Sequence, residues 1–144
     1  GMSAWSAAPE VPDSIREFVG QMLDALGVSI YMSDEKYVDM ALAVSASGPA
    51  FVYVFMESLI DAGVLLGLPR DMAHTLAQQL IIGSGVLARE TGKHPAELRN
   101  LVTSPGGTTA AGLQVMEDAG FRGTVIKAAT AAWERGEELG RGSK

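Results

Sequence analysis

Three proline residues, each placed just before an apolar run, constrain the fold of this chain more than any other feature. They stand in Gly48-Pro49, Leu68-Pro69 and His94-Pro95. Proline suits the first turn of a helix and disrupts a helix interior, so each one predicts a break in the chain followed by a new helix. The apolar spacing after them predicts helices over residues 49–67, 69–90 and 95–102.

The remaining segments also carry helical patterns. Apolar residues from Ile15 to Leu26 recur at helical spacing and stop at Gly27. Further helices are expected from Ser33 or Asp34 toward Ser45, around Leu113, and over 121–139. Residues 28–32 are the exception: apolar and polar side chains alternate weakly there, which predicts a short extended connector. The expected architecture is therefore an all-α bundle of about six or seven helices, in one domain of 144 residues.

Charge and cysteine content exclude several classes of protein. The formal charge of −6 argues against a nucleic-acid partner, and the absence of cysteine excludes disulfides, thiol catalysis and thiolate metal sites. Residues 1–10 lack the pattern of a secretory signal, so a cytoplasmic location is the default expectation. The apolar stretch 49–68 is long enough to cross a bilayer, but Glu57 and Asp61 interrupt it. It is predicted to be a buried core helix, with no membrane partner.

Two of the helices are apolar on nearly every side. Residues 49–67 contain two charged side chains and residues 72–87 contain none, which is more apolar surface than a small monomer readily hides. We therefore expect a dimer or a larger oligomer. Gly83, Ser84, Gly85 and Ala88 form a small-residue patch that permits close approach of a helix, either from another chain or from within the monomer.

Few side chains could carry catalysis. His74 and His94 lack a second histidine at metal-ligand spacing, and both are expected to be structural. Glu57 and Asp61 lie four residues apart on one helix face, where acid–base catalysis is conceivable. An interface or hydrogen-bonding role is the favoured interpretation of this pair, and no metal site is expected.

The segment from Thr103 to Thr109 is the most informative part of the chain. Its sequence is Thr-Ser-Pro-Gly-Gly-Thr-Thr, and it leads directly into a helix. The glycines permit close backbone approach, and the first amides of the helix have no internal acceptor, so the loop could bind a small carboxylate or phosphate. It lacks the lysine of a nucleotide P-loop. From the residues alone, a simple helix-capping loop is the favoured interpretation, and anion binding is the alternative.

This loop, with Ala111-Gly112-Leu113 after it, resembles the signature of pyrroline-5-carboxylate reductases. Other segments follow the order of that family, and the resemblance runs from about Phe18 to Leu139. They are Ser45-Ala46-Ser47-Gly48-Pro49-Ala50-Phe51, Asp61-Ala62-Gly63-Val64, Gly67-Leu68-Pro69-Arg70, Thr91-Gly92-Lys93-His94-Pro95 and Gly120-Phe121-Arg122. Ala46 stands where the family usually has glycine, and Asn100 where aspartate is common.

The resemblance implies a substrate-binding and dimerisation domain that interlocks with its two-fold partner. By this analogy, backbone amides around Gly106, Gly107 and Thr108 hold the carboxylate of Δ1-pyrroline-5-carboxylate. The Thr109 hydroxyl bonds the ring nitrogen as the catalytic residue, and Val102 and Ser104 line the pocket. The reaction implied is reduction to L-proline with NADPH or NADH.

The resemblance covers only the second half of such an enzyme. No Gly-rich dinucleotide-binding segment is found, so no cofactor is expected on this chain, which should be inactive alone. The implied organisation is an interdomain linker or cloning remnant over 1–10, the helical domain over 11–139 and a frayed tail over 140–144. A non-enzymatic helical oligomerisation module that retains the fold is the alternative.

Overall fold

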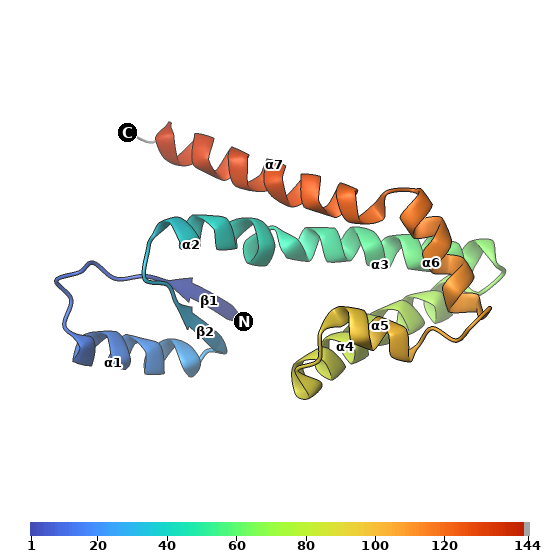
Figure 1. Cartoon of the computed structure of the whole chain (residues 1–144), viewed down its shortest axis with the longest axis horizontal. Helices are drawn as coiled ribbons and strands as arrows, with labels where there is room; N and C mark the ends of the chain where they lie inside the picture. The colour runs from blue at the N-terminus through green and yellow to red at the C-terminus, as the bar shows by residue number, and fades with distance from the viewer. Residues whose placement is uncertain (143–144) are drawn as a thin grey trace. The chain divides into compact units, whose positions relative to one another are not determined.

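A computed structural model describes residues 1–142 of the chain. Within them it contains seven α-helices, one π-helical segment and two short strands (Figure 1). In chain order these are β1 (Met2–Trp5), α1 (Asp13–Asp24), β2 (Val28–Tyr31), α2 (Lys36–Ala41), the π-helix η1 (Leu42–Ala46), α3 (Gly48–Leu65), α4 (Arg70–Thr91), α5 (Pro95–Leu101), α6 (Thr108–Asp118) and α7 (Phe121–Arg141). The predominantly helical architecture is confirmed.

Internal contacts divide the chain into two compact units. The first comprises Gly1–Pro49 together with the residues from Ile126 onward, and the second comprises Ala50–Val125. The candidate loop lies wholly in the second unit. The predicted tail, 140–144, is helical as far as Arg141, and residues 143–144 lie outside those that the structure describes.

The first unit contains a β–α–β arrangement that the sequence did not reveal. Strand β1 pairs in parallel with β2, with Met2 opposite Val28 and Trp5 opposite Tyr31. The weak alternation over 28–32 predicted an extended segment, and β2 confirms it. Nothing predicted the strand at Met2–Trp5, because its pairing partner lies far away along the chain.

The predicted break at Ser47-Gly48-Pro49 is wrong. The backbone stays helical through Ser47, and the segment from Lys36 to Leu65 forms one continuous helical run. The Ser47 amide donates to the Leu42 carbonyl at 2.9 Å, one residue farther than in an α-helix. This wider π-turn accommodates Pro49, which has no amide of its own to donate, without ending the helix.

In the second unit, local signals mark the helix ends correctly. Helix α4 begins after Pro69 and ends at Gly92, which has a left-handed conformation with φ of 60°. Gly67 and Gly120 adopt φ of 101° and 68° after α3 and α6. These positive φ values strain any residue with a Cβ atom, so glycine fits each of these ends.

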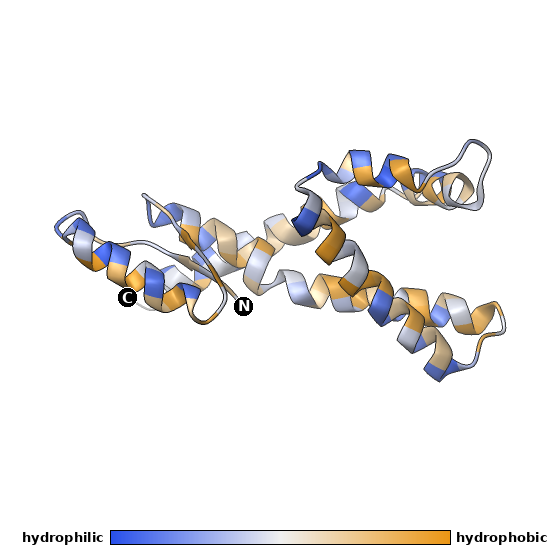
Figure 2. Cartoon of the chain, turned by 90° about the horizontal axis from the view of Figure 1, so that it is seen from below, coloured by the Kyte–Doolittle hydropathy of each residue, from blue (hydrophilic) through white to orange (hydrophobic). Residues whose placement is uncertain are grey.

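The expectation of a buried core helix over 49–68 is wrong for the single chain. Helix α3 has no buried residue, and the buried apolar residues among those described are three alanines: Ala43, Ala73 and Ala77. By length and composition the run Lys36–Leu65 could cross a membrane, although a single such helix is weak evidence for one. Figure 2 shows hydrophobic residues along the helices of both units. Large apolar side chains such as Tyr53 and Leu65 are 65% and 88% exposed, so the single chain leaves apolar surface uncovered.

Candidate functional site

A tight turn organises the loop between α5 and α6. The Gly107 amide donates to the Ser104 carbonyl at 3.0 Å. Pro105 and Gly106 are the two central residues, and Gly106 has φ of 67°. Proline followed by a residue with positive φ is typical of a type II turn. The dipeptide Pro105-Gly106 therefore sets the shape of this loop locally.

The second glycine is required for a different reason. A Cβ atom at Gly107 would collide with the Ser104 hydroxyl oxygen and lie 3.2 Å from the Ser104 carbonyl oxygen. Gly107 is also the N-cap of α6, and it offers no side chain to cap the helix. Its backbone is extended, with φ of −77°, so glycine is selected here by space and not by conformation.

Three consecutive amides at the start of α6 have no acceptor among the described residues. The first helical bond links the Ala111 amide to the Gly107 carbonyl at 3.2 Å. The amides of Thr108, Thr109 and Ala110 precede it and remain free of protein partners. Of the amides predicted to bind the anion, those around Gly106, Gly107 and Thr108, the Gly107 amide is engaged in the turn and the Thr108 amide is free. Together with the helix dipole, these donors favour a small anion.

The predicted site residues lie together on this loop. Thr109 is half-buried, whereas Ser104 and Thr108 are exposed, and Val102 retains 64% exposure. The hydroxyl of Thr109 bonds no group within residues 1–142, so it is available to a ligand. The neighbouring Thr103 is engaged instead: its hydroxyl donates to the Arg99 carbonyl at 2.6 Å and ties the loop to the end of α5.

An ion pair joins the end of α6 to the beginning of α7. The Arg122 guanidinium donates to both oxygens of Glu117, with nitrogen–oxygen distances of 2.7–3.1 Å. These hydrogen bonds, and the positive charges of Arg122 and Arg99, lower the pKa of Glu117, while Glu117 raises the pKa of Arg122. Neither Glu117 nor Arg99 is marked out by the sequence alone. The Gly120-Phe121-Arg122 motif was the available signal for the pair.

The other polar candidates have local partners or none. His94 is the N-cap of α5, and its Nδ1 accepts from the Ala96 amide at 3.2 Å, as a structural role predicts. Asp61 pairs with Arg70 at 3.0 Å, and Glu57 and His74 are exposed. The structure therefore gives Asp61 an arginine partner, and no catalytic carboxylate pair with Glu57 is formed.

The two departures from the family pattern are accommodated locally. Asn100 accepts from the Arg99 guanidinium at 3.1 and 3.4 Å, which replaces the charge pairing that an aspartate would offer. Ala46 is exposed in the π-helix η1. Neither residue disturbs the turn at Pro105-Gly106.

The described residues do not fit a dinucleotide cofactor or a metal. The connection between β1 and α1, residues 6–12, contains no glycine, so the backbone cradle that receives a pyrophosphate is missing there. Within residues 1–142 no cluster of His, Asp and Glu is arranged to hold a metal ion. The chemistry that these residues can offer is binding and orientation of a small acid.

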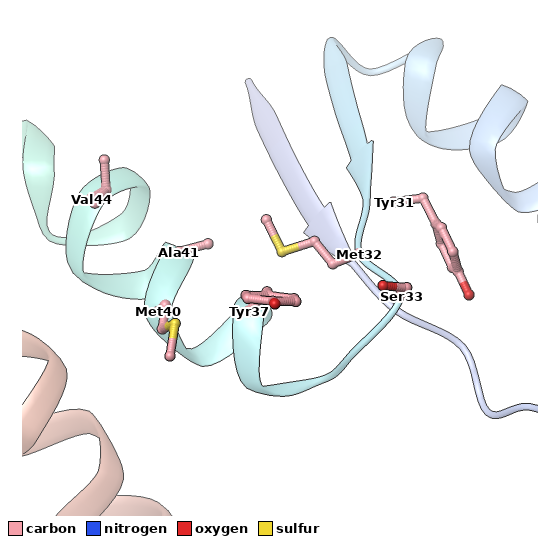
Figure 3. A pocket seen from close by; sticks show the side chains of 7 residues that line it. All are labelled: Tyr31, Met32, Ser33, Tyr37, Met40, Ala41 and Val44. Atoms are coloured by element: carbon pink, nitrogen blue, oxygen red, sulfur yellow. The ribbon is translucent and has the colours of Figure 1, made fainter.

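A hollow lies in the first unit, between the end of β2 and the helical segment formed by α2 and η1 (Figure 3). Its lining is mainly apolar and contains no charged group, so it does not suit a small acid. It is lined by Tyr31, Met32, Ser33, Tyr37, Met40, Ala41 and Val44.

The small-residue patch on α4 is not used within this chain. Gly83, Ser84 and Gly85 are exposed, and Cβ atoms built on the two glycines would meet no atom within 4 Å. Leu80, Ile82 and Val86 on the same helix are 52%, 51% and 43% exposed, so α4 also leaves large apolar side chains uncovered in the single chain.

Comparison with known proteins gives consistent matches. Residues 35–139 match the family described as pyrroline-5-carboxylate reductase dimerisation. The chain is 44% identical to the pyrroline-5-carboxylate reductase of Glycine max over 138 residues, which cover 96% of this chain and 49% of that protein. It is also 44% identical to the reductase of Synechocystis over 142 residues, covering 98% and 52% of the two chains.

Solved structures agree with these sequence matches. A pyrroline-5-carboxylate reductase from Coxiella burnetii superposes with a TM-score of 0.92 at 36% identity, covering 96% of this chain and 51% of that one. The NADP-bound pyrroline carboxylate reductase of Plasmodium falciparum superposes with a TM-score of 0.84 at 35% identity, covering 95% of this chain and 56% of that one. The chain thus spans about half the length of the relatives that it matches.

Proposed function

This chain belongs to the family of the pyrroline-5-carboxylate reductase dimerisation domain, and we propose that it is the substrate-binding and dimerisation part of a reductase that converts Δ1-pyrroline-5-carboxylate to L-proline. The observation that carries the proposal is the row of free amides at Thr108, Thr109 and Ala110 behind the Pro105-Gly106 turn. The substrate of such an enzyme is a small cyclic carboxylate, which is the kind of anion that these donors suit.

The chain's own part in the reaction is to hold and orient the substrate. The free amides and the dipole of α6 bind the carboxylate, and the Thr109 hydroxyl bonds the ring nitrogen. Ser104 and Val102, together with Gly106 and Gly107, form the wall of the site. A protonated imine is already electrophilic, so this reduction needs no nucleophile or acid–base pair from the protein, and the loop offers none.

NADPH or NADH would supply the hydride. Because residues 6–12 offer no pyrophosphate cradle, we assign no residue of this chain to that cofactor. The single chain is then expected to bind a substrate-like acid weakly and to show no reductase activity by itself.

The proposal includes a homodimer whose subunits interlock through the exposed apolar faces of the helices. The supporting observations are the uncovered surface of α3 and α4 and the family match over 35–139. Family membership also supports a cytoplasmic location for the reaction and gives no reason to expect a nucleic-acid or membrane partner.

Titration of L-proline into the ¹⁵N-labelled chain tests the substrate site. The largest chemical-shift changes are expected at the Thr108, Thr109 and Ala110 amides. Thr109→Val should weaken the shifts, while Thr108→Val, the same change at the exposed neighbour, should preserve them. Shifts centred outside 104–110, or an unchanged response in Thr109→Val, would contradict the assignment. No response at any position, in a chain that is dimeric, would favour the non-enzymatic oligomerisation module.

A further inference from the structure

The side chain of Thr103 attaches the loop before α6 to the end of α5. Thr103 is partly buried, whereas residues 102 and 104–106 on either side of it are exposed. Its amide donates to the Asn100 carbonyl at 3.2 Å, and its hydroxyl donates to the Arg99 carbonyl at 2.6 Å. The last carbonyls of a helix have no donor within the helix, so both bonds satisfy groups of this kind. Thr103 is therefore attached twice to the last turn of α5.

The turn that precedes α6 begins at the next residue. The Ser104 carbonyl accepts from the Gly107 amide, and this bond closes the turn over Pro105-Gly106. Thr103 and Ser104 share one peptide group, so the two bonds of Thr103 restrict the direction in which the chain enters the turn. The turn ends at Gly107, which is the N-cap of α6. Because proline fixes its own φ, little freedom remains between the attachment and the N-cap.

The orientation of the free amides determines how well they bind an anion. The amides of Thr108, Thr109 and Ala110 belong to the first turn of α6, which directly follows the loop. A binding site has to be held within about 0.5 Å of its productive geometry by supporting hydrogen bonds. If the loop moved freely about Ser104, these amides and the Thr109 hydroxyl would have to be ordered when the ligand binds, and that ordering would weaken binding.

We propose that Thr103 is a positioning residue of this site: its hydroxyl holds the loop against α5 and thereby fixes the orientation of the α6 amides toward a bound carboxylate. In this role Thr103 does not touch the ligand, and it acts through Ser104 and the turn. The ligand, a small cyclic acid, rests on the proposed function, whereas the attachment of the loop rests on the hydrogen bonds of Thr103.

The chain offers a matched control for the Thr103 hydroxyl. Thr91 lies at the end of α4, where its hydroxyl donates to the Leu87 carbonyl at 2.7 Å. This is the same kind of bond, from a threonine to the carbonyl four residues earlier, at a helix end that does not precede the turn. Thr103→Val and Thr91→Val each remove one such bond and keep the shape of the side chain. Helical circular dichroism and thermal unfolding confirm that each variant is folded.

Titration of L-proline into the ¹⁵N-labelled chain measures the effect on binding. Thr103→Val should weaken binding about fivefold, the scale of one lost hydrogen bond, whereas Thr91→Val should change it less than about twofold. Thr103→Ser keeps the hydroxyl and should restore the affinity to within about twofold of the parent chain. A merely structural role would lower the stability of both valine variants and leave the affinity unchanged. Parent-like affinity in Thr103→Val, or no restoration in Thr103→Ser, would overturn the proposal.

Amide hydrogen exchange tests the attachment of the loop without any ligand. In Thr103→Val the Gly107 amide, which closes the turn, should exchange roughly threefold faster than in the parent chain. The Gly120 amide, which donates to the Glu117 carbonyl at 2.9 Å beyond the other end of α6, should not change. Unchanged exchange at Gly107 would overturn the proposal. If the parent chain gives no proline response, the proposed function fails, and exchange at Gly107 still decides whether Thr103 holds the loop.

Discussion

The second unit contains two pairs of glycines whose backbone conformations and surroundings differ. In the loop before α6, Gly106 has a positive φ and Gly107 abuts Ser104, so this chain alone explains both. In α4, Gly83 and Gly85 have ordinary helical conformation and open space around them. A glycine in a helix interior costs about 0.5–1 kcal/mol relative to alanine. The loop is therefore specified from within the chain, whereas no contact within residues 1–142 explains the α4 glycines.

The largest expected effect tests the outside contact on α4. Leu80 is 52% exposed in the single chain, yet Leu80→Asp should destabilise the assembly by more than about 3 kcal/mol, because a carboxylate would replace a side chain buried by the partner. Chemical unfolding measures the change. The matched control, Gln78→Asp on the same helix, should change stability by less than about 0.5 kcal/mol. Equal, small effects would show that the α4 face stays in solvent.

Gly83→Ala distinguishes the two kinds of glycine by the sign of its effect. An open helical site should gain about 0.5–1 kcal/mol from alanine. Against a closely packed partner helix, the added methyl group should instead cost about 1–3 kcal/mol. We expect destabilisation, together with a shift toward monomer in sedimentation. A more stable dimer would show that Gly83 does not lie in the interface.

Substitutions of the loop glycines should lower the free energy of unfolding without changing the oligomeric state. Gly106→Ala places a Cβ atom at φ of 67° and should cost about 1–2 kcal/mol. Gly107→Ala should be relieved in part by Ser104→Ala, because the collision involves the Ser104 hydroxyl. A double-mutant cycle in unfolding experiments measures the coupling. Additive effects would mean that the contact between these two residues is unimportant.

The smallest effect concerns the ion pair at the end of α6. The pKa of Glu117 is lowered by its hydrogen bonds from Arg122, so the pair contributes its full stability above the ordinary glutamate pKa of 4.5. That contribution is lost as pH falls below 4.5 and through the lowered pKa. Because both side chains are exposed, the change should be small. The difference in Tm between the parent and Glu117→Gln should shrink as the pH is lowered from 6 to 3.

Local chemistry made the helix ends and the loop predictable from sequence. Pro69, Gly92 and Pro105-Gly106 act through their own backbone restrictions, so the expected positions agree with the structure within one or two residues. Pro49 was misinterpreted because a π-turn absorbed it inside a continuous helix. That outcome depends on the turn preceding the proline and not on the proline itself.

Non-local contacts explain the rest of the differences. Strand β1 forms only by pairing with β2, and its four residues carry no alternating pattern. Helix α3 was expected to be buried because it is apolar, but none of its residues is buried in the single chain. For the site, the residues alone favoured a helix-capping loop at Thr103–Thr109, with anion binding as the alternative. The identity of the substrate came only from the resemblance to a known family.

Sedimentation equilibrium tests the claim that a second copy completes this fold. At micromolar concentration we expect a single species of twice 15.1 kDa, with helical circular dichroism that is lost as dilution dissociates the dimer. A 15.1 kDa monomer that keeps its full helical signal and unfolds cooperatively at the same concentration would contradict the claim.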